Sequence, residues 1–220
     1  ARRMIEMEWI DYEKASGKGH LRFYPKGAIG HSVLEHMVHS LAQNRLEVIP
    51  VVTPMVFNWD DDQISGEAGT FQDNLYHVRP GGDPNASGQV LRFGGDFGVF
   101  KVMQDAKLIE AQLPLRVYEA GVGFRSNKPG ERSNIQRADS FYLPCSYSFC
   151  RNDISAGIDE FVFLHTKFSE FLAGLGLEYS HVFEINETFF NQHREEISGM
   201  LQQDNKPALI KLASGKRLYY

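Results

Sequence analysis

The sequence has 220 residues, of which 42% are hydrophobic, so it is long enough for one sizeable domain or a domain with a small appendage. Its 23 basic and 28 acidic residues leave a formal net charge of −5, which excludes a broadly basic nucleic-acid-binding surface and leaves only local contacts. The sequence contains no run of about eighteen apolar residues and no signal-peptide pattern, so we predict a cytoplasmic protein without a membrane span.

Helix and strand patterns can be followed along the first half of the chain. Apolar residues recur at spacings of three and four over 28–45, which predicts an amphipathic helix. The β-branched run 46–57 predicts a strand, and Pro50 and Pro54 place that strand at a sheet edge or an interface. Further along, the predicted elements are short strands over 74–79 and 89–94, joined by a long loop, and a helix over 98–111.

The second half begins with a hairpin pattern. Strand-like runs over 115–124 and 140–150 enclose a loop rich in Pro, Gly, Ser and Asn, with arginines near both ends of the loop. The elements predicted after it are a helix over 154–175, a strand over 177–186, a helix over 189–202 and a pair of strands over 206–212 and 216–220. The buried side predicted for the first of these helices carries Ile158, Phe161, Val162, Leu164, Phe168 and Leu172. Helices around a largely antiparallel set of strands indicate an α+β fold.

The cysteines and a histidine-rich helix do not predict a metal site. Cys145 and Cys150 are the only cysteines, too few and too widely spaced for a metal knuckle, and in a reducing compartment we expect free thiols. The stretch "HSVLEHMVH" also resembles a ligand cluster. On a helix His31 and His36 do not share a face, whereas His36 and His39 could share one. We interpret this stretch as polar helix surface rather than as a metal site.

Three stretches in chain order resemble the threonyl-tRNA synthetase branch, of archaeal type, of the class II aminoacyl-tRNA synthetases. They are "FYPKGAIGHSVLEHMVHSLAQNRLEVIPVVTPMVF", which is similar to motif 1, "LPLRVYEAGVGFR", which is similar to the entry of motif 2, and "FYLPCSYSFC", at the place of the family's "TMPDMH" or "TQDDAH" strand. The resemblance implies an N-terminal extension over 1–18 and a class II catalytic domain over 19–220, with an antiparallel sheet flanked by helices. It also implies a homodimer, with Pro54 and Val51 at the interface.

The same resemblance implies a site that binds ATP with Mg²⁺. Arg125 takes the place of the catalytic motif 2 arginine on the α-phosphate and the amino-acid carboxylate. Phe141 takes the place of the residue that stacks on adenine, Arg137 would hold phosphates or the loop, and Glu119 matches the family's glutamate at the strand entry. The alternative from the residues alone is a solvated hairpin whose arginines pair with Glu119 and Glu131.

Several departures from the family pattern alter the expected substrate pocket. Asn127 replaces the glutamate of the motif 2 Arg-x-Glu sequence and loses its charge. Asp96 stands at the zinc-binding cysteine and Tyr147 at a zinc-binding histidine, so we do not expect zinc in this pocket. Cys145 replaces an aspartate that contacts the substrate. Motif 3 is not found in the sequence, so we expect tRNA contact to need regions that are absent from it.

Three functions remain open from the sequence. The first is a threonyl-tRNA synthetase-like catalytic module, degenerate or truncated, for ATP-dependent aminoacyl-adenylate formation. The second is a non-catalytic scaffold for dimerisation or tRNA positioning, for example in editing of threonine tRNA. The third is a synthetase-like ligase for another amino acid.

Overall fold

The computed structural model describes residues 2–17, 19–79, 81, 87–132 and 135–214. The chain divides into two compact units, Ala1–Ser148 and Phe149–Tyr220, and each is described by itself. No helix in the described ranges is long and apolar enough to cross a membrane.

The first unit opens with a small helix–hairpin segment that leads into a long helix. Its elements are α1 (Arg2–Glu6), β1 (Ile10–Tyr12), the antiparallel partner β2 (Leu21–Phe23) and α2 (Pro25–Arg45). Pro25 suits the first turn of α2, where its missing N–H would have no intrahelical partner. Strand β1 lies within the segment 1–18 that we interpreted as an extension, and it pairs with β2.

Two three-stranded sheets follow in the same unit. The first has the order β3 (Ile49–Pro50), β7 (Leu115–Phe124) and β8 (Ser140–Phe149), and β3 runs parallel to β7. The second has the order β4 (Val56–Asn58), β6 (Gln89–Leu91) and β5 (His77–Val78), with antiparallel pairs. The helical segments that connect these strands along the chain are α3 (Asp62–Ala68), η1 (Gly69–Asn74), α4 (Asp96–Gln104) and η2 (Glu110–Gln112).

An apolar core holds the second sheet against α3 and α4. It is formed by Ile64, Ala68, Leu75, Val90, Phe93 and Phe97. The α3 helix starts at Asp61, whose carboxylate accepts hydrogen bonds from the backbone N–H groups of Gln63 and Ile64, as an N-cap does. This core fixes Phe93 and the start of α4 beside the hairpin formed by β7 and β8.

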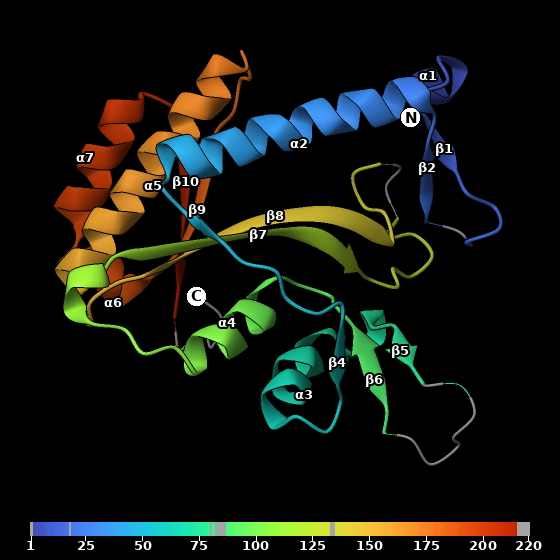
Figure 1. Ribbon diagram of the computed structural model, residues 1–220. Helices are drawn as coiled ribbons and strands as arrows, with labels where there is room; N and C mark the ends of the chain where they lie inside the picture. Colours follow the sequence, from blue (N-terminus) through green and yellow to red (C-terminus); the bar gives the residue numbers. More distant parts are fainter. Residues whose placement is uncertain (1, 18, 80, 82–86, 133–134, 215–220) are drawn as a thin grey trace. The chain divides into compact units, whose positions relative to one another are not determined.

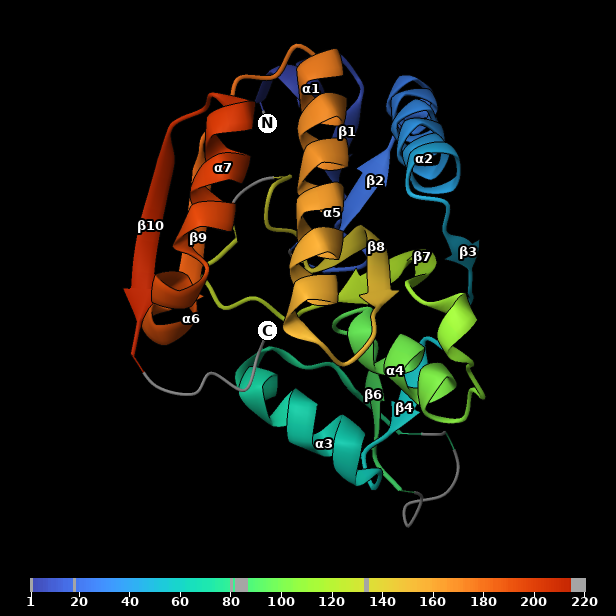
Figure 2. The same ribbon diagram turned by 90° about the vertical axis from the view of Figure 1, so that its left-hand side faces the viewer.

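The second unit is built from helices and one parallel strand pair (Figure 2). Its elements are α5 (Ile154–Gly174), β9 (His181–Asn186), α6 (Glu187–Gln192), α7 (Arg194–Asp204) and β10 (Ala208–Ala213). Strands β9 and β10 are parallel, with Ala208 opposite His181. The side chains of Asp153 and Asn186 cap α5 and α6 by accepting backbone hydrogen bonds.

The predicted α+β class is confirmed, although β3–β7 and β9–β10 are parallel pairs. The single strand predicted over 46–57 is wrong: the chain forms only β3 and β4 there. Between them the Thr53 N–H donates to the Glu119 carboxylate at 2.5 Å instead of to a neighbouring strand, and Pro54 has no N–H to donate.

Other predicted boundaries also need correction. The helix predicted over 98–111 is α4, which begins at Asp96 and ends at Gln104, and the helix predicted over 189–202 is divided at His193 into α6 and α7. Phe161 and Phe168, which we placed on the buried side of α5, are 51% and 42% exposed. The last predicted strand, 216–220, lies outside the described residues. Cys145 and Cys150 form no disulfide in the part of the chain that the structure describes.

Candidate functional site

The two faces of the β7–β8 hairpin have different neighbours. Alternate residues of a strand point to opposite faces. On one face, the rings of Tyr118 and Tyr142 contact His39 and His31 of α2, with centroids 5.3 Å apart in both pairs. Helix α2 therefore covers this face (Figure 1). The alternate positions of β7 and β8, which include Glu119, face the other side of the sheet.

A pocket of about 290 Å³ is lined partly by the loop that joins β7 to β8. Its lining is formed by Phe71, Asn74, Arg125, Asn127, Ile135, Gln136, Arg137, Ala138 and Phe141. The lining contains two arginines and, within the part of the chain that the structure describes, no carboxylate. Cationic groups beside aromatic and aliphatic walls suit a ligand that is anionic at one end and flat at the other.

Arg125 is held in a defined orientation at this pocket. Its Nε donates a hydrogen bond to the carbonyl oxygen of Phe93 at 2.9 Å. Its guanidinium carbon lies 5.1 Å from the ring centre of Phe71 and 5.3 Å from that of Phe141, within the range of cation–π contacts. Gly123 permits this arrangement, because a Cβ there would lie 2.8 Å from the Phe141 ring. The guanidinium is therefore positioned before any ligand arrives.

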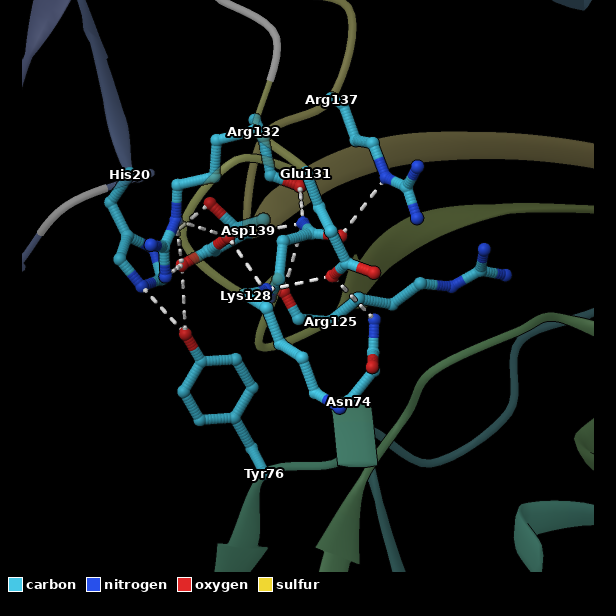
Figure 3. A network of polar contacts seen from close by, with 12 residues as sticks. His20, Asn74, Tyr76, Arg125, Lys128, Glu131, Arg132, Arg137 and Asp139 are labelled. Carbon is cyan, nitrogen blue, oxygen red and sulfur yellow. Dashed lines mark hydrogen bonds and ion pairs between the residues drawn. The ribbon is translucent and has the colours of Figure 1, made fainter. Parts of the chain in front are cut away.

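The loop that carries Arg125 and Arg137 is organised around one buried carboxylate, that of Asp139 (Figure 3). The Asp139 side chain is 1% exposed and accepts from Arg132 Nη2 at 2.8 Å, from Arg132 Nε at 3.1 Å and from Asn127 Nδ2 at 3.0 Å. Tyr76 adds a weaker hydroxyl contact at 3.4 Å. Such paired bonds from arginine to a carboxylate are among the strongest in proteins.

The Asp139 backbone ties the same loop to two other segments. Its N–H donates to the carbonyl oxygen of Gly19 and its own carbonyl oxygen accepts from the Arg125 N–H, each at 2.8 Å. Gly19 has a φ of +99°, and a Cβ there would lie 2.4 Å from the carboxylate carbon, so only glycine fits. Burial raises the pKa of Asp139, but the hydrogen bonds and charge of Arg132, together with Asn127, outweigh it and hold the pKa below its usual value.

Asn127 belongs to this network rather than pointing into open solvent. It is 3% exposed, its Nδ2 donates to Ala138 and Asp139, and its Oδ1 accepts from Arg137 Nε at 3.2 Å. An amide can donate and accept at the same time, which a carboxylate cannot. The asparagine thus fits a position next to a buried aspartate, where a glutamate would bring two like charges together.

Glu119 lies outside the pocket lining, in a buried ion pair. Its carboxylate is 2.9 Å from Nη1 of Arg92 and also accepts from the Thr53 hydroxyl at 3.0 Å, and both Glu119 and Arg92 are 2% exposed. A Cβ at Gly121 would lie 2.0 Å from Nη2 of Arg92, so the glycine lets the guanidinium lie flat on the strand. The alternative in which Glu119 pairs with a hairpin arginine is therefore wrong.

The structure describes all four residues that depart from the family pattern of the substrate pocket. Asn127 is described above. Cys145 and Tyr147 of β8 lie close to Gly95, the residue directly before α4. A Cβ added to Gly95 would lie 3.3 Å from the Cys145 sulfur and 2.6 Å from the Tyr147 hydroxyl. Asp96 is the first residue of α4. Burial raises the pKa of the Cys145 thiol, which disfavours the thiolate that metals bind.

Known proteins are similar to this sequence over nearly its whole length. The threonine–tRNA ligase of Methanopyrus kandleri is 30% identical over 223 residues, which cover 99% of this chain and 35% of the ligase. That of Pyrococcus furiosus is 32% identical over 225 residues, which cover 100% of this chain and 35% of the ligase. This chain is similar over its whole length to threonine–tRNA ligases. The predicted relationship to threonyl-tRNA synthetases is therefore confirmed, and the chain spans about a third of the length of these relatives.

Solved structures show the same fold. The RNA-binding domain of threonyl-tRNA synthetase from Cryptosporidium parvum Iowa II superposes with a TM-score of 0.77 at 20% identity, covering 100% of this chain and 54% of that one. Prolyl-tRNA synthetase of Giardia lamblia, solved with prolyl-adenylate, superposes with a TM-score of 0.64 at 15% identity, covering 78% of this chain and 34% of that one. No family model matches the sequence.

The sequence analysis assigned Arg125, Arg137 and Phe141 to one site, and all three line the pocket. It missed Phe71, which also lines the pocket, and Asp139, which holds the loop. Phe71 lies in η1 and carries no motif that would have singled it out. Asp139 had a weak signal: it is an acidic residue directly before an apolar strand, and its partners are up to 120 positions away in the chain, as the Gly19 contact shows.

Proposed function

We propose that this chain is a class II synthetase-like module that acts in threonine tRNA aminoacylation and binds ATP in the pocket around Arg125. The observation that carries the proposal is the stacked and hydrogen-bonded Arg125 beside Arg137, in a pocket whose described lining has no carboxylate. Arginine forks bind phosphate oxygens in pairs and stay charged at every physiological pH. The module would act in the cytoplasm.

In this proposal the triphosphate lies against Arg125 and Arg137, and adenine lies against Phe141. Mg²⁺ prefers carboxylate and phosphate oxygens, and the described lining supplies no carboxylate, so Mg²⁺ would arrive bound to the triphosphate. When an amino-acid carboxylate attacks the α-phosphate, negative charge builds up on the phosphorus oxygens. A guanidinium already oriented toward them stabilises that charge without further rearrangement.

A non-catalytic scaffold is the second candidate, and specific residues favour it over full activity. Asn127 is engaged in the loop network, and Cys145 and Tyr147 crowd the start of α4 where a zinc-based reader of the substrate would need its ligands. Adenylate formation with threonine is therefore expected to be weak. The structural neighbour described as an RNA-binding domain supports a role in tRNA positioning, with further contacts from the parts of the relatives that this sequence does not span.

Calorimetric titration with ATP and Mg²⁺ tests the pocket. We expect Arg125→Ala to weaken ATP binding by about 10- to 100-fold, because a charged hydrogen-bond donor contributes about 1.5–3 kcal/mol. The matched control is Arg194→Ala, since Arg194 also lies over a phenylalanine ring, that of Phe190, but in the second unit. Equal affinity in Arg125→Ala and the wild type would contradict the pocket assignment. Absence of ATP binding in the wild type would favour the scaffold.

Amino-acid-dependent pyrophosphate exchange then separates the enzymatic candidates. Exchange with threonine would support the catalytic module, and exchange with a different amino acid would support a ligase of altered specificity. ATP binding without exchange for any amino acid would leave nucleotide-dependent scaffolding as the function.

We also propose a homodimer formed through α2 and β3. Ile29 and Leu34 on α2 are 67% and 59% exposed, and Val52 after β3 is 93% exposed, which leaves an apolar surface of a kind that mediates association. The double variant Val51→Glu/Pro54→Glu is expected to sediment as a monomer, because it adds charges inside this surface.

The control for the dimer is Val182→Glu, which places a charge on an apolar side chain that is 71% exposed in the second unit. It should leave the sedimentation coefficient unchanged. A wild-type monomer, or a double variant that still dimerises, would contradict the proposed interface.

A further inference from the structure

Three residues of the second unit bring metal-binding atoms together, away from the pocket described above. His165 lies in α5, His181 begins β9 and Asp204 ends α7. One ligand atom from each of the three lies within 4.8 Å of the other two. None of these residues was singled out by the sequence, because each belongs to a different element and none forms a short-range ligand motif.

Two of the three already form a hydrogen-bonded pair. His181 Nε2 contacts Asp204 Oδ2, and the Tyr179 hydroxyl donates to both oxygens of the same carboxylate, at 3.3 and 3.4 Å. An imidazole and a carboxylate, with a hydroxyl that orients the carboxylate, are arranged like the ligands of a metal site and the outer group that holds one of them.

His165 is the residue that this pair does not explain. Its ring centre is 4.8 Å from that of His181, and its Nε2 is buried with no hydrogen-bond partner among the described residues. A buried ring nitrogen without a partner costs free energy unless something binds it.

We propose that His165, His181 and Asp204 bind a divalent transition-metal ion of the zinc type. Two imidazoles and a carboxylate are the protein ligands of many zinc sites, with water in the fourth position. At zinc–ligand distances of about 2.0–2.1 Å, tetrahedral ligand atoms lie about 3.3 Å apart, so modest side-chain rotations from the observed arrangement are enough.

An entry path and a structural role follow from the surroundings. A pocket of about 270 Å³ adjoins the cluster, and its lining includes His165, Glu170, Met200 and Asp204. The ion would connect α5, β9 and α7, three elements that the sequence separates. It would therefore raise the stability of this unit, because a ligand that binds only the folded state favours that state.

Equilibrium dialysis of the full chain against Zn²⁺, with metal quantified by mass spectrometry, tests the proposal. We expect one ion per chain, and at least about tenfold weaker binding in each of His165→Gln, His181→Gln and Asp204→Asn. The matched control is His36→Gln/His39→Gln, which removes two exposed histidines of α2. It should leave the number of bound Zn²⁺ ions and their affinity unchanged. Circular dichroism of each variant checks that it is folded.

A second measurement uses only the wild type, so it does not depend on the folding of any variant. Co²⁺ should give the intense visible absorption of a four-coordinate site, and Zn²⁺ should displace it and raise the thermal unfolding midpoint. No bound Zn²⁺ at millimolar concentration, binding unchanged in all three ligand variants, or binding lost in the α2 control would each overturn the proposal.

Discussion

Glu119→Gln is expected to lower the free energy of unfolding by about 3–5 kcal/mol, because it leaves a buried arginine without its counter-charge. Arg92 and Glu119 are each 2% exposed and lie 2.9 Å apart. Nε and Nη2 of Arg92 already have no hydrogen-bond partner among the described residues, so nothing in that part of the chain is in place to replace the lost carboxylate. Denaturant unfolding of the wild type and the variant measures the difference.

Two further variants show whether the effect comes from the buried pair. In Arg92→Met/Glu119→Leu both charges are removed, so part of the lost stability should return, since an apolar pair of similar volume avoids the desolvation of two ions. The return is partial because Thr53 loses the acceptor of its N–H and hydroxyl. Glu6→Gln acts on the exposed Arg2–Glu6 pair, whose side chains are 93% and 59% exposed, and should cost about 0–1 kcal/mol. A loss below about 1 kcal/mol in Glu119→Gln would contradict the structural role of the pair.

Asp139→Ala is expected to cost about 3 kcal/mol or more and to weaken ATP binding by about 10- to 100-fold, because one carboxylate holds Arg132 and Asn127 in the loop. The loop contributes Arg137 and the Asn127 amide to the pocket lining, so its rearrangement removes half of the proposed phosphate contacts. Chemical denaturation and the ATP titration measure the two effects. Asp159→Ala, at an exposed position of α5, is the control and should leave both unchanged.

The same carboxylate predicts a pH dependence. The folded state lowers the pKa of Asp139, so the folded protein holds fewer protons than the unfolded chain just below the usual carboxyl range. Its contribution to stability is complete above the ordinary pKa of about 3.9 and is lost as the pH falls through the lowered value. Stability measured from pH 6 to pH 2 should fall less steeply in Asp139→Asn than in the wild type. Equal slopes would contradict an ionised, ion-paired Asp139.

Local sequence patterns determined several elements of this fold correctly. The three- and four-residue spacing of apolar residues predicted α2, and the polar loop between two apolar runs predicted the β7–β8 hairpin. These features depend on near neighbours in the chain, which is why periodicity and turn composition suffice to predict them. The family resemblance likewise rested on contiguous motifs and was confirmed over the whole chain.

The errors in the predicted elements arose where distant contacts compete with local preference. The run 46–57 has strand propensity throughout, yet Glu119 on β7 takes the Thr53 N–H and ends the strand pairing. The apolar face of α2 was recognised as a stripe, but the structure leaves Ile29, Val33 and Leu34 exposed in the single chain. A stripe shows that a face is apolar and does not show what covers it.

The sequence by itself determined the α+β class, the hairpin with its arginines and the relationship to threonyl-tRNA synthetases. Only the tertiary structure showed that Asp139 organises the loop, that Phe71 completes the pocket, and that His165, His181 and Asp204 meet. The physical reason is that each arrangement includes a contact between residues far apart in the chain, such as Asp139 with Gly19 and Tyr76. Their proximity is decided by packing and burial, which no local pattern of residues encodes.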